Sequence, residues 1–590
     1  MKEFFKVLFA SALGVFISAG ILMFIGFVLM VGMISSLSSS TARLPKGNEK
    51  VLALSLKGSL SEISNENPFA NLFNQDKNPS INEILSAIEI AKENQQIEGI
   101  FLNMASFATG AANVDVIRRA LIDFKQNGKF VVAYADNYTQ SSYYLSSVAD
   151  KVFLNPIGSL GLTGFASQIT FYKGILRKAG IEMLIFKVGT FKGAVEPFML
   201  DKLSNENREQ ITVFQQGVWK NVVNQIASAR NISEEQINRF ADNGLMFSPA
   251  QDAVDYGLVD ELRYREEAVK YIKELVGADL KKPLNTVDAI QIKGLKKKNP
   301  PQKGDRIAVI FAEGEITTSD NTSLNSSANY ITEKLVDELI KLKRDDKVKA
   351  VVLRVNSPGG SAHVSEQIWK QVNDLRKEKK IVVSMGQMAA SGGYYISCAA
   401  DKIIAEANTL TGSIGVFGMF PNATELYGKL DLTTDVVKTN KYADIGDLSR
   451  PMREDEKKLI QNAVEYFYDV FLTRCADGRS MSKEAIDRIG QGRVWTGEKA
   501  HEIGLVDEIG DLERAIKVAA ELAELTQYQV KIISGSSDPM TEFMKKLMGD
   551  VKSSILRNEL GDSYEFVNVM RSIKRMSGIQ ARLPYDMDDL

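Results

Sequence analysis

The sequence predicts an α/β protein built from two tandem parallel-sheet domains that follow an amino-terminal transmembrane helix. Three observations support this prediction. Short apolar runs alternate with amphipathic helical patterns along most of the 590 residues, which is typical of βαβ units. The two halves of the chain repeat each other's pattern, and a long uncharged segment lies near the amino terminus.

The amino-terminal segment from Val7 to Ile34 contains no charged residue. It is longer than the roughly 20 residues that cross a bilayer and longer than the apolar core of a signal peptide. We therefore expect residues 1–48 to form a short cytoplasmic stub and an uncleaved membrane anchor. No second run of this kind follows, so the rest of the chain is expected to form one body on one side of the membrane.

The two halves match at a constant spacing of 251 residues. Tyr143-Tyr144 recurs as Tyr394-Tyr395, and Asp150-Lys151-Val152 recurs as Asp401-Lys402-Ile403. Within the second half, the apolar run Val351–Val355 predicts a buried strand. The predicted division is a first repeat over 49–292, a charged linker that contains Pro300-Pro301 over 293–305, a second repeat over 306–535, and a tail over 536–590 whose role the sequence does not indicate.

The composition narrows the possible functions. The net charge is −2, with 44% hydrophobic and 25% charged residues, so no overall basic field favours nucleic acid as a partner. Two cysteines, Cys398 and Cys475, are too few for a disulfide framework or a cysteine-rich metal site, and we expect buried thiols. Histidine occurs only at His363 and His501. We expect no metal and no cofactor.

Three segments carry residues suited to chemistry. Asn356–Ser361 contains Gly359 and Gly360 between a strand and a helix, where backbone N–H groups can stabilise an oxyanion. Met388–Tyr394 places Ser391 among small residues, as a nucleophile or as a helix cap. Each segment also has an ordinary structural interpretation, because strand-to-helix turns commonly contain glycine and serine.

The third segment, Lys187–Phe198, places Lys192 among apolar and small residues. Burial there would lower the pKa of its amine, whereas a solvated surface lysine is the commoner state. The repeat favours a catalytic role for these residues, because the first half has the lysine without the serine and the glycine pair, and the second half has the serine and the glycine pair without the lysine. The matched pairs are Ser391 with Gln140, Lys192 with Ala443, Gly359 with Ala108, and Gly360 with Thr109. We therefore expect a composite site with one part from each half.

These segments resemble the long form of the signal peptide peptidase A (protease IV) family, in the Ser/Lys peptidase clan. Ser384–Ser397 resembles the family's nucleophile segment, and Lys187–Phe198 resembles its base segment. Further similar segments are Leu410–Val416, Val494–Gly497 and Gly504–Asp507. The resemblance covers residues 49–535 and the anchor.

The resemblance implies tandem crotonase-like, Clp-protease-like domains and a serine endopeptidase in which Ser391 attacks and Lys192 acts as the base. It further implies a bacterial inner-membrane protein with its catalytic body in the periplasm, a homotetramer, and cleaved signal peptides as substrates. We expect substrate to bind as an extended strand. We also expect Lys192 to serve Ser391 of its own chain, although a neighbouring chain is the alternative.

Three other hypotheses remain at this stage. A Ser/His hydrolase would use His363, which follows Gly360 closely but has no evident acidic partner. A crotonase-like acyl-CoA enzyme would use the same glycine-rich turn and would need neither an anchor nor a divided Ser/Lys pair. A non-catalytic membrane scaffold would leave Ser391 unreactive toward acylating probes.

Overall fold

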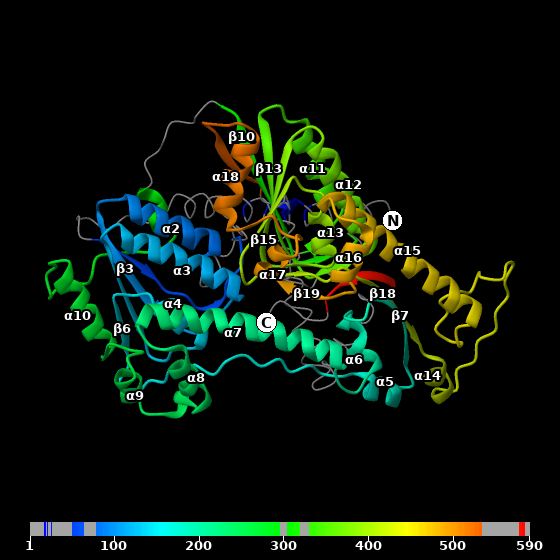
Figure 1. The fold of residues 1–590 in the computed structure, drawn as a ribbon, viewed down its shortest axis with the longest axis horizontal. Helices are drawn as coiled ribbons and strands as arrows, with labels where there is room; N and C mark the ends of the chain where they lie inside the picture. Colours follow the sequence, from blue (N-terminus) through cyan, green and yellow to red (C-terminus); the bar gives the residue numbers. More distant parts are fainter. Residues whose placement is uncertain are drawn as a thin grey trace, which may run out of the picture.

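The computed structural model describes residues 50–63, 78–295, 304–318, 330–533 and 578–583, together with six helical positions between Gly14 and Ile25. Apart from those six positions, the predicted anchor lies outside the described residues, as do most of the predicted linker and most of the tail. Among the residues that the structure does describe, no helix is both long enough and apolar enough to cross a bilayer. Within these ranges the chain has the mixed α/β architecture that the sequence predicts (Figure 1).

The first half folds around a parallel sheet with the strand order β8-β6-β5-β3-β1-β9. Helices cover this sheet, and a short two-stranded ladder, β2 with β4, lies beside it. The strands are β1 (Lys50–Leu54), β2 (Gly58–Ser59), β3 (Ile97–Met104), β4 (Phe107–Ala108), β5 (Phe130–Ala135), β6 (Lys151–Leu154), β8 (Glu261–Leu262) and β9 (Thr286–Val287). The helices are α2 (Ile81–Glu93), α3 (Ala111–Gln126), α4 (Gln140–Ser146), α5 (Lys173–Ala179), α6 (Glu196–Met199), α7 (Asn205–Arg230), α8 (Glu234–Asp242), α9 (Ala250–Asp255) and α10 (Arg265–Leu275).

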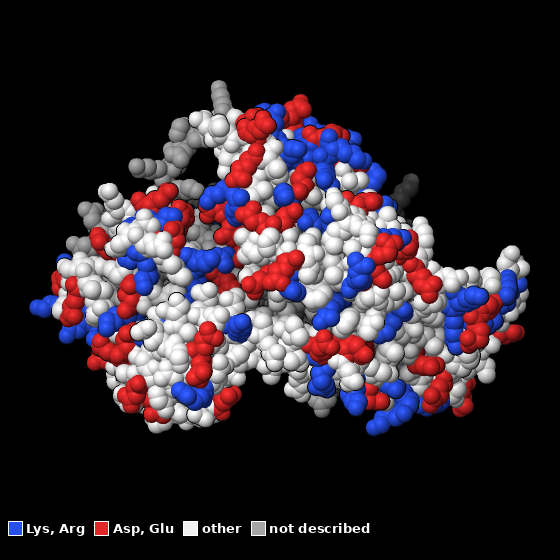
Figure 2. All heavy atoms as spheres, in the orientation of Figure 1, with Lys and Arg blue, Asp and Glu red and all other residues white. Residues whose placement is uncertain are grey.

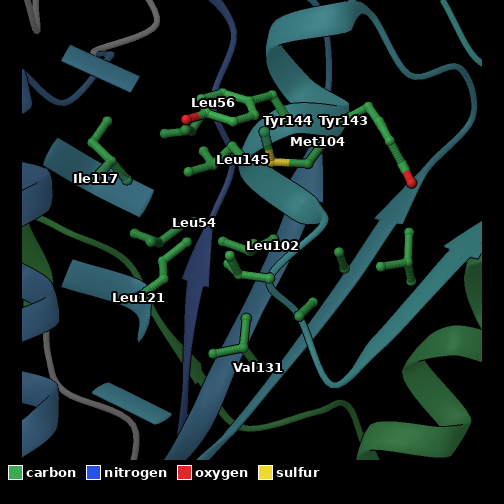
Figure 3. Close-up of a cluster of buried hydrophobic side chains, with 14 of the residues drawn as sticks. Leu54, Leu56, Leu102, Met104, Ile117, Leu121, Val131, Tyr143, Tyr144 and Leu145 are labelled. Atoms are coloured by element: carbon green, nitrogen blue, oxygen red, sulfur yellow. The ribbon is translucent and has the colours of Figure 1, made fainter. Parts of the chain in front are cut away.

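The core of this half forms where the sheet meets α3 and α4. Figure 3 shows Leu54, Leu102 and Val131 from neighbouring strands pointing toward Ile117 and Leu121 of α3. All five side chains are buried. Apolar residues spaced one helical turn apart thus cover an apolar strand face, which is the pattern expected of a βαβ unit.

The second half repeats this arrangement with the strand order β20-β16-β15-β13-β10-β21, and β17 and β19 extend the sheet from β15. The strands are β10 (Arg306–Glu313), β13 (Val348–Ser357), β15 (Lys380–Ala390), β16 (Lys402–Ala405), β17 (Leu410–Gly412), β19 (Val494–Thr496), β20 (Glu508–Ile509) and β21 (Gln529–Ile533). The helices are α11 (Lys334–Arg344), α12 (Ala362–Arg376), α13 (Gly392–Ser397), α14 (Thr424–Lys429), α15 (Glu454–Arg479), α16 (Lys483–Ile489), α17 (Gly497–Glu502) and α18 (Leu512–Leu522).

Buried hydrogen bonds repeat between the halves as well. The hydroxyl of Tyr143 donates to the carbonyl of Leu258 at 2.8 Å, and that of Tyr394 donates to Leu505 at 2.9 Å. The tyrosines that revealed the repeat in the sequence therefore hold the same position in both halves.

A third sheet joins the two halves, with the order β12-β11-β14-β22-β18-β7. Its members are β7 (Glu182–Val188) of the first half, β11 (Glu315–Ile316), β12 (Tyr330–Ile331), β14 (Gly359–Ser361) and β18 (Val416–Asn422) of the second half, and β22 (Gly578–Arg582) of the tail. Strand β7 pairs antiparallel with β18 along its whole length. The sequence predicted neither this sheet nor the strand in the tail.

Polar pairs, in which Glu406, Asp115 and Asn408 are buried, add to this junction. Arg119 of α3 contacts Glu406 at 2.5 Å, and Asp115 accepts a hydrogen bond from Asn408 at 2.6 Å. The long helix α7 extends from the junction back beneath the first sheet (Figure 1). On the face shown in Figure 2, basic and acidic side chains are mixed over both halves, in keeping with the net charge near zero.

Candidate active site

Ser391 lies at the sharp turn between β15 and α13. Its backbone has φ 55° and ψ −113°, a region that residues other than glycine rarely adopt. The turn is held by a hydrogen bond from its N–H to the carbonyl of Gly412 at 2.8 Å. This backbone conformation is strained and is held in place by the surrounding contacts, as is common at functional sites.

Lys192 follows β7, the strand of the first half that pairs with β18. Its Nζ lies 2.7 Å from the Oγ of Ser391 within the same chain. Both residues are buried, with 1% of Lys192 and 0% of Ser391 exposed. The structure thus brings the serine of one half onto the lysine of the other, and β7 is the element that carries the lysine across.

Ser413 completes the surroundings of the amine. Lys192 Nζ lies 3.1 Å from the Ser413 hydroxyl and 3.3 Å from the Ser413 carbonyl oxygen. Burial lowers the pKa of Lys192 well below its usual value, because removal from water penalises the charged form. A neutral amine has two N–H groups and one lone pair. Its N–H groups can serve the two Ser413 oxygens, which leaves the lone pair for the Ser391 hydroxyl.

The second half cradles the lysine stem. A Cβ atom added to Gly492 would lie 2.7 Å from the backbone nitrogen of Lys192, so only glycine fits there. The N–H of Phe191 donates to the carbonyl of Gln491 at 2.9 Å. On the other side, Val195 and Phe198 are buried in an apolar cluster with β18. The apolar residues that follow Lys192 in the predicted base segment are therefore buried against the second half.

The amino-terminal end of α7 fixes the lysine turn to the second half. Gln210 donates from Nε2 to the carbonyl of Phe191 at 3.0 Å and accepts from the N–H of Val494 at 3.1 Å. Asn207 donates to Glu196 at 2.5 Å. All of these side chains are buried, so the position of Lys192 depends on contacts from both halves.

The glycine pair lies beside Ser391. Gly359 has φ 96°, and a Cβ atom placed on it would lie 2.7 Å from the backbone nitrogen of Gly392. The backbones of these two glycines therefore meet next to the serine. The N–H of Gly359 donates to the Ser357 hydroxyl at 3.2 Å, and Gly360 forms part of β14.

The other candidate residues lie elsewhere. His363 is exposed on α12 and hydrogen bonds with Gln367 at 2.7 Å, and His501 contacts the carbonyl of Val506. Cys398 and Cys475 are buried free thiols. No cluster of potential metal ligands occurs within the described ranges.

Sequence reasoning missed the roles of Ser413, Gly492 and Gln210 in this geometry. Ser413 belongs to the Leu410–Val416 segment, which had been identified only as a family motif. Neither its positive φ of 51° nor its contact with Lys192 can be predicted from the order of polar and apolar residues in the sequence. Gly492 reaches Lys192 only when the two halves assemble, and Gln210 links the residue before Lys192 to Val494 of the second half.

Models of known protein families match segments in both halves of the chain. The model of peptidase family S49 matches residues 123–279 and 373–526, one segment in each half. The Clp protease model matches residues 305–411.

Three relatives match most of the chain. Protease 4 of Salmonella typhi is 38% identical over 485 residues, which cover 81% of this chain and 77% of the relative. Protease 4 of Haemophilus influenzae is 35% identical, over 90% of this chain and 89% of the relative. The chloroplastic serine protease SPPA of Arabidopsis thaliana is 30% identical, over 92% of this chain and 78% of the relative.

Proposed function

Because this chain belongs to peptidase family S49 and is a serine peptidase, we propose that Ser391 is its nucleophile and Lys192 its general base. The observation that carries the proposal is the 2.7 Å contact between Lys192 Nζ and Ser391 Oγ. The lowered pKa of Lys192 supports it further, since only a neutral amine can accept a proton.

In the first step, the Ser391 hydroxyl gives its proton to Lys192 as Oγ attacks the scissile carbonyl. Lys192 then gives the proton to the departing amine, which leaves an ester on Ser391. In the second step, Lys192 takes a proton from a water molecule that attacks the ester carbonyl. It then returns this proton to Ser391 Oγ as the ester bond breaks, which releases the acid product and restores the serine hydroxyl and the neutral amine. Ser413 holds the amine in place through both steps, because its two oxygens occupy the remaining N–H groups.

We place the oxyanion against the backbone N–H groups of Gly359 and Gly392. Gly392 directly follows the nucleophile, and its nitrogen faces Gly359. The N–H of Gly359 would turn from the Ser357 hydroxyl, to which it makes a long hydrogen bond, or be shared with the substrate. The sequence predicted Gly359 and Gly360 as the two donors. We keep Gly359 and replace Gly360 with Gly392, because Gly360 pairs with β11 and β22 in the third sheet.

An acylating serine-directed probe tests the proposal. We expect stoichiometric attachment to Ser391, located by mass spectrometry of the digested protein, because Lys192 activates this hydroxyl alone. A Lys187→Met variant, altered in the preceding strand, serves as a control that should label like the wild type. Attachment to a different residue, or none at Ser391 in an active preparation, would refute the assignment.

A Ser413→Ala variant is expected to lower kcat by about 10- to 100-fold with little change in KM. The variant removes a hydrogen bond that orients the base but touches no substrate, and positioning contacts of this kind are worth a few kcal/mol. A Ser413→Thr variant, which keeps the hydroxyl, should recover part of the activity. Steady-state kinetics on a peptide substrate measure the effect, and an unchanged kcat for Ser413→Ala would show that Ser413 does not position Lys192.

We further propose that the chain acts on cleaved signal peptides from the periplasmic face of a bacterial inner membrane. The uncharged segment from Val7 to Ile34 supports an anchor. A mainly apolar pocket, which includes Phe214, Met388 and Leu410 in its lining, supports apolar peptides as substrates.

Self-association into a homotetramer is part of the same proposal. The segment between α14 and α15 projects from the second half (Figure 1) and exposes Leu432 and Val437, the latter 98% exposed. Exposed apolar side chains grouped in this way suit a subunit contact. Sedimentation of a Val437→Asp variant alongside the wild type would test it, with dissociation as the expected result.

A further inference from the structure

A hydrogen-bonded pair of a tyrosine and a carboxylate occurs in both halves of the chain. In the first half, the hydroxyl of Tyr144 on α4 donates to Asp115 of α3 at 2.5 Å. In the second half, the hydroxyl of Tyr395 on α13 donates to Glu366 of α12 at 2.5 Å. Both members of the two pairs are 251 residues apart in the sequence. The pairs are therefore equivalent in the repeat, and α4 is the counterpart of α13, the helix that Ser391 precedes.

The two carboxylates differ in their second contact. Glu366 forms an ion pair with Arg474 of α15 at 2.6 Å, so this contact stays within the second half. Asp115 instead accepts a hydrogen bond from the side-chain amide of Asn408 at 2.6 Å, and this bond crosses the junction between the halves. Asp115 is 7% exposed and Asn408 is 5% exposed. A hydrogen bond shielded from water in this way is costly to break, because each partner would stay buried without the other.

Asn408 lies in the short loop of residues 406–409, which joins β16 to β17. Arg119, from the next turn of α3, contacts Glu406 at the start of this loop at 2.5 Å. At the end of the loop, the Thr409 hydroxyl donates to the carbonyl of Gly386 on β15 at 2.7 Å. The loop is therefore fixed both to α3 of the first half and to the strand that leads to the nucleophile.

Strand β17 follows this loop directly and leads to both members of the proposed catalytic pair. It pairs with Met388–Ala390, the last three residues of β15 before Ser391. The carbonyl of Gly412, the last residue of β17, accepts the N–H of Ser391 at 2.8 Å. Ser413 comes next and contacts Lys192 through its hydroxyl and its carbonyl oxygen. A shift of the loop would therefore move the groups that hold the serine turn and the lysine amine.

We propose that Asp115 is a positioning residue for the catalytic pair and acts across the junction through Asn408 and β17. Its carboxylate oxygens are occupied by Tyr144 and Asn408, so it acts through the loop and does not touch the reacting groups. The first half thus supplies the base and also supports the strand that orients it. This inference rests on the proposed function for the roles of Ser391 and Lys192.

Exchange of the two hydrogen-bonding side chains tests the proposal. In an Asp115→Asn variant, the new amide oxygen can accept from Tyr144, but its NH₂ group faces the NH₂ group of Asn408. We expect the rate constant for acylation of Ser391 by a serine-directed probe to fall about tenfold, because small displacements of catalytic groups are costly. The double variant Asp115→Asn/Asn408→Asp restores a donor opposite an acceptor and should recover most of the wild-type rate constant.

An Asp123→Asn variant provides the matched control. Asp123 lies on the same helix as Asp115, but its carboxylate is 54% exposed and pairs with Lys92 of its own half. This variant should react with the probe at the wild-type rate.

The amount of label distinguishes positioning from a loss of folded protein. We expect Asp115→Asn to reach one label per chain, only more slowly. Partial unfolding would instead lower the final amount of label and leave the rate constant of the folded fraction unchanged. A wild-type rate constant in Asp115→Asn, or no recovery in the double variant, would overturn the proposal.

Hydrogen exchange followed by mass spectrometry separates this inference from the catalytic proposal, because it requires no reaction at Ser391. The backbone amides of residues 406–413 should exchange about tenfold faster in Asp115→Asn than in the wild type, and more slowly again in the double variant. Unchanged exchange would overturn the inference, whether or not the probe reacts. Faster exchange with no label on Ser391 in any variant would refute the catalytic proposal and leave the support of β17 by Asp115 standing.

Discussion

A Lys192→Met variant is expected to lose about a thousandfold or more in kcat/KM. Methionine keeps the length and apolar packing of the lysine stem but cannot accept the Ser391 proton, and removal of a general base commonly costs this much. Hydrolysis of a fluorogenic peptide measures the loss. Lys187→Met, the matched change on β7, should retain activity, because that side chain lies outside the site. Appreciable activity in Lys192→Met would rule out Lys192 as the base.

The same variant reports the protonation state of the lysine. Burial lowers the pKa of Lys192 in the folded chain, whereas the unfolded chain keeps the ordinary value of about 10.4. Between these two values the unfolded chain binds one more proton, so the stability of the wild type rises with pH. The slope is about 1.4 kcal/mol per pH unit for a single group.

We therefore expect the thermal unfolding midpoint of the wild type to rise relative to that of Lys192→Met as the pH increases from 7 to 9.5. The activity of the wild type should rise over the pH range in which Lys192 loses its proton, because only the neutral amine is active. Parallel unfolding midpoints across this range would mean that Lys192 has an ordinary pKa in the folded chain. The mechanism would then lose its main electrostatic support.

The sequence predicted the parts of this site better than their assembly. Alternating strands and helices predicted two parallel sheets, and the 251-residue repeat singled out Ser391 and Lys192 by showing that each half lacks one of them. These signals are local or periodic, so they survive in a single sequence. The 2.7 Å contact between the two residues depends instead on the pairing of β7 with β18, which no local pattern encodes.

The tail shows the same limit more strongly. The run Ile579–Leu583 alternates apolar and polar residues, but this alternation does not indicate its partners, and its place is set by its pairing with β14 and β18. Gly492 is informative only once Lys192 lies against it. Contacts between distant segments are tertiary effects that override local propensity.

The second large effect is expected at Ser391, where replacement by alanine or glycine should reduce kcat by about ten-thousandfold or more, because both remove the nucleophile. The two variants should differ in stability. Backbone strain at φ 55° and ψ −113° costs about 1–3 kcal/mol in alanine and nothing in glycine. Glycine also lowers the free energy of unfolding by about 0.4–1 kcal/mol, because it gives the unfolded chain more conformational freedom. Ser391→Gly should thus be more stable than Ser391→Ala by on the order of 1 kcal/mol.

Ser397 provides the matched control for this comparison, because it lies at the other end of the same short helix. There the backbone is helical, so Ser397→Gly should be less stable than Ser397→Ala by roughly 0.5–1 kcal/mol. Thermal unfolding of the four variants measures both differences, and we expect opposite signs at the two serines. If glycine is the less stable replacement at Ser391 as well, the turn stores no strain. The orientation of the buried hydroxyl toward Lys192 would then come from packing alone.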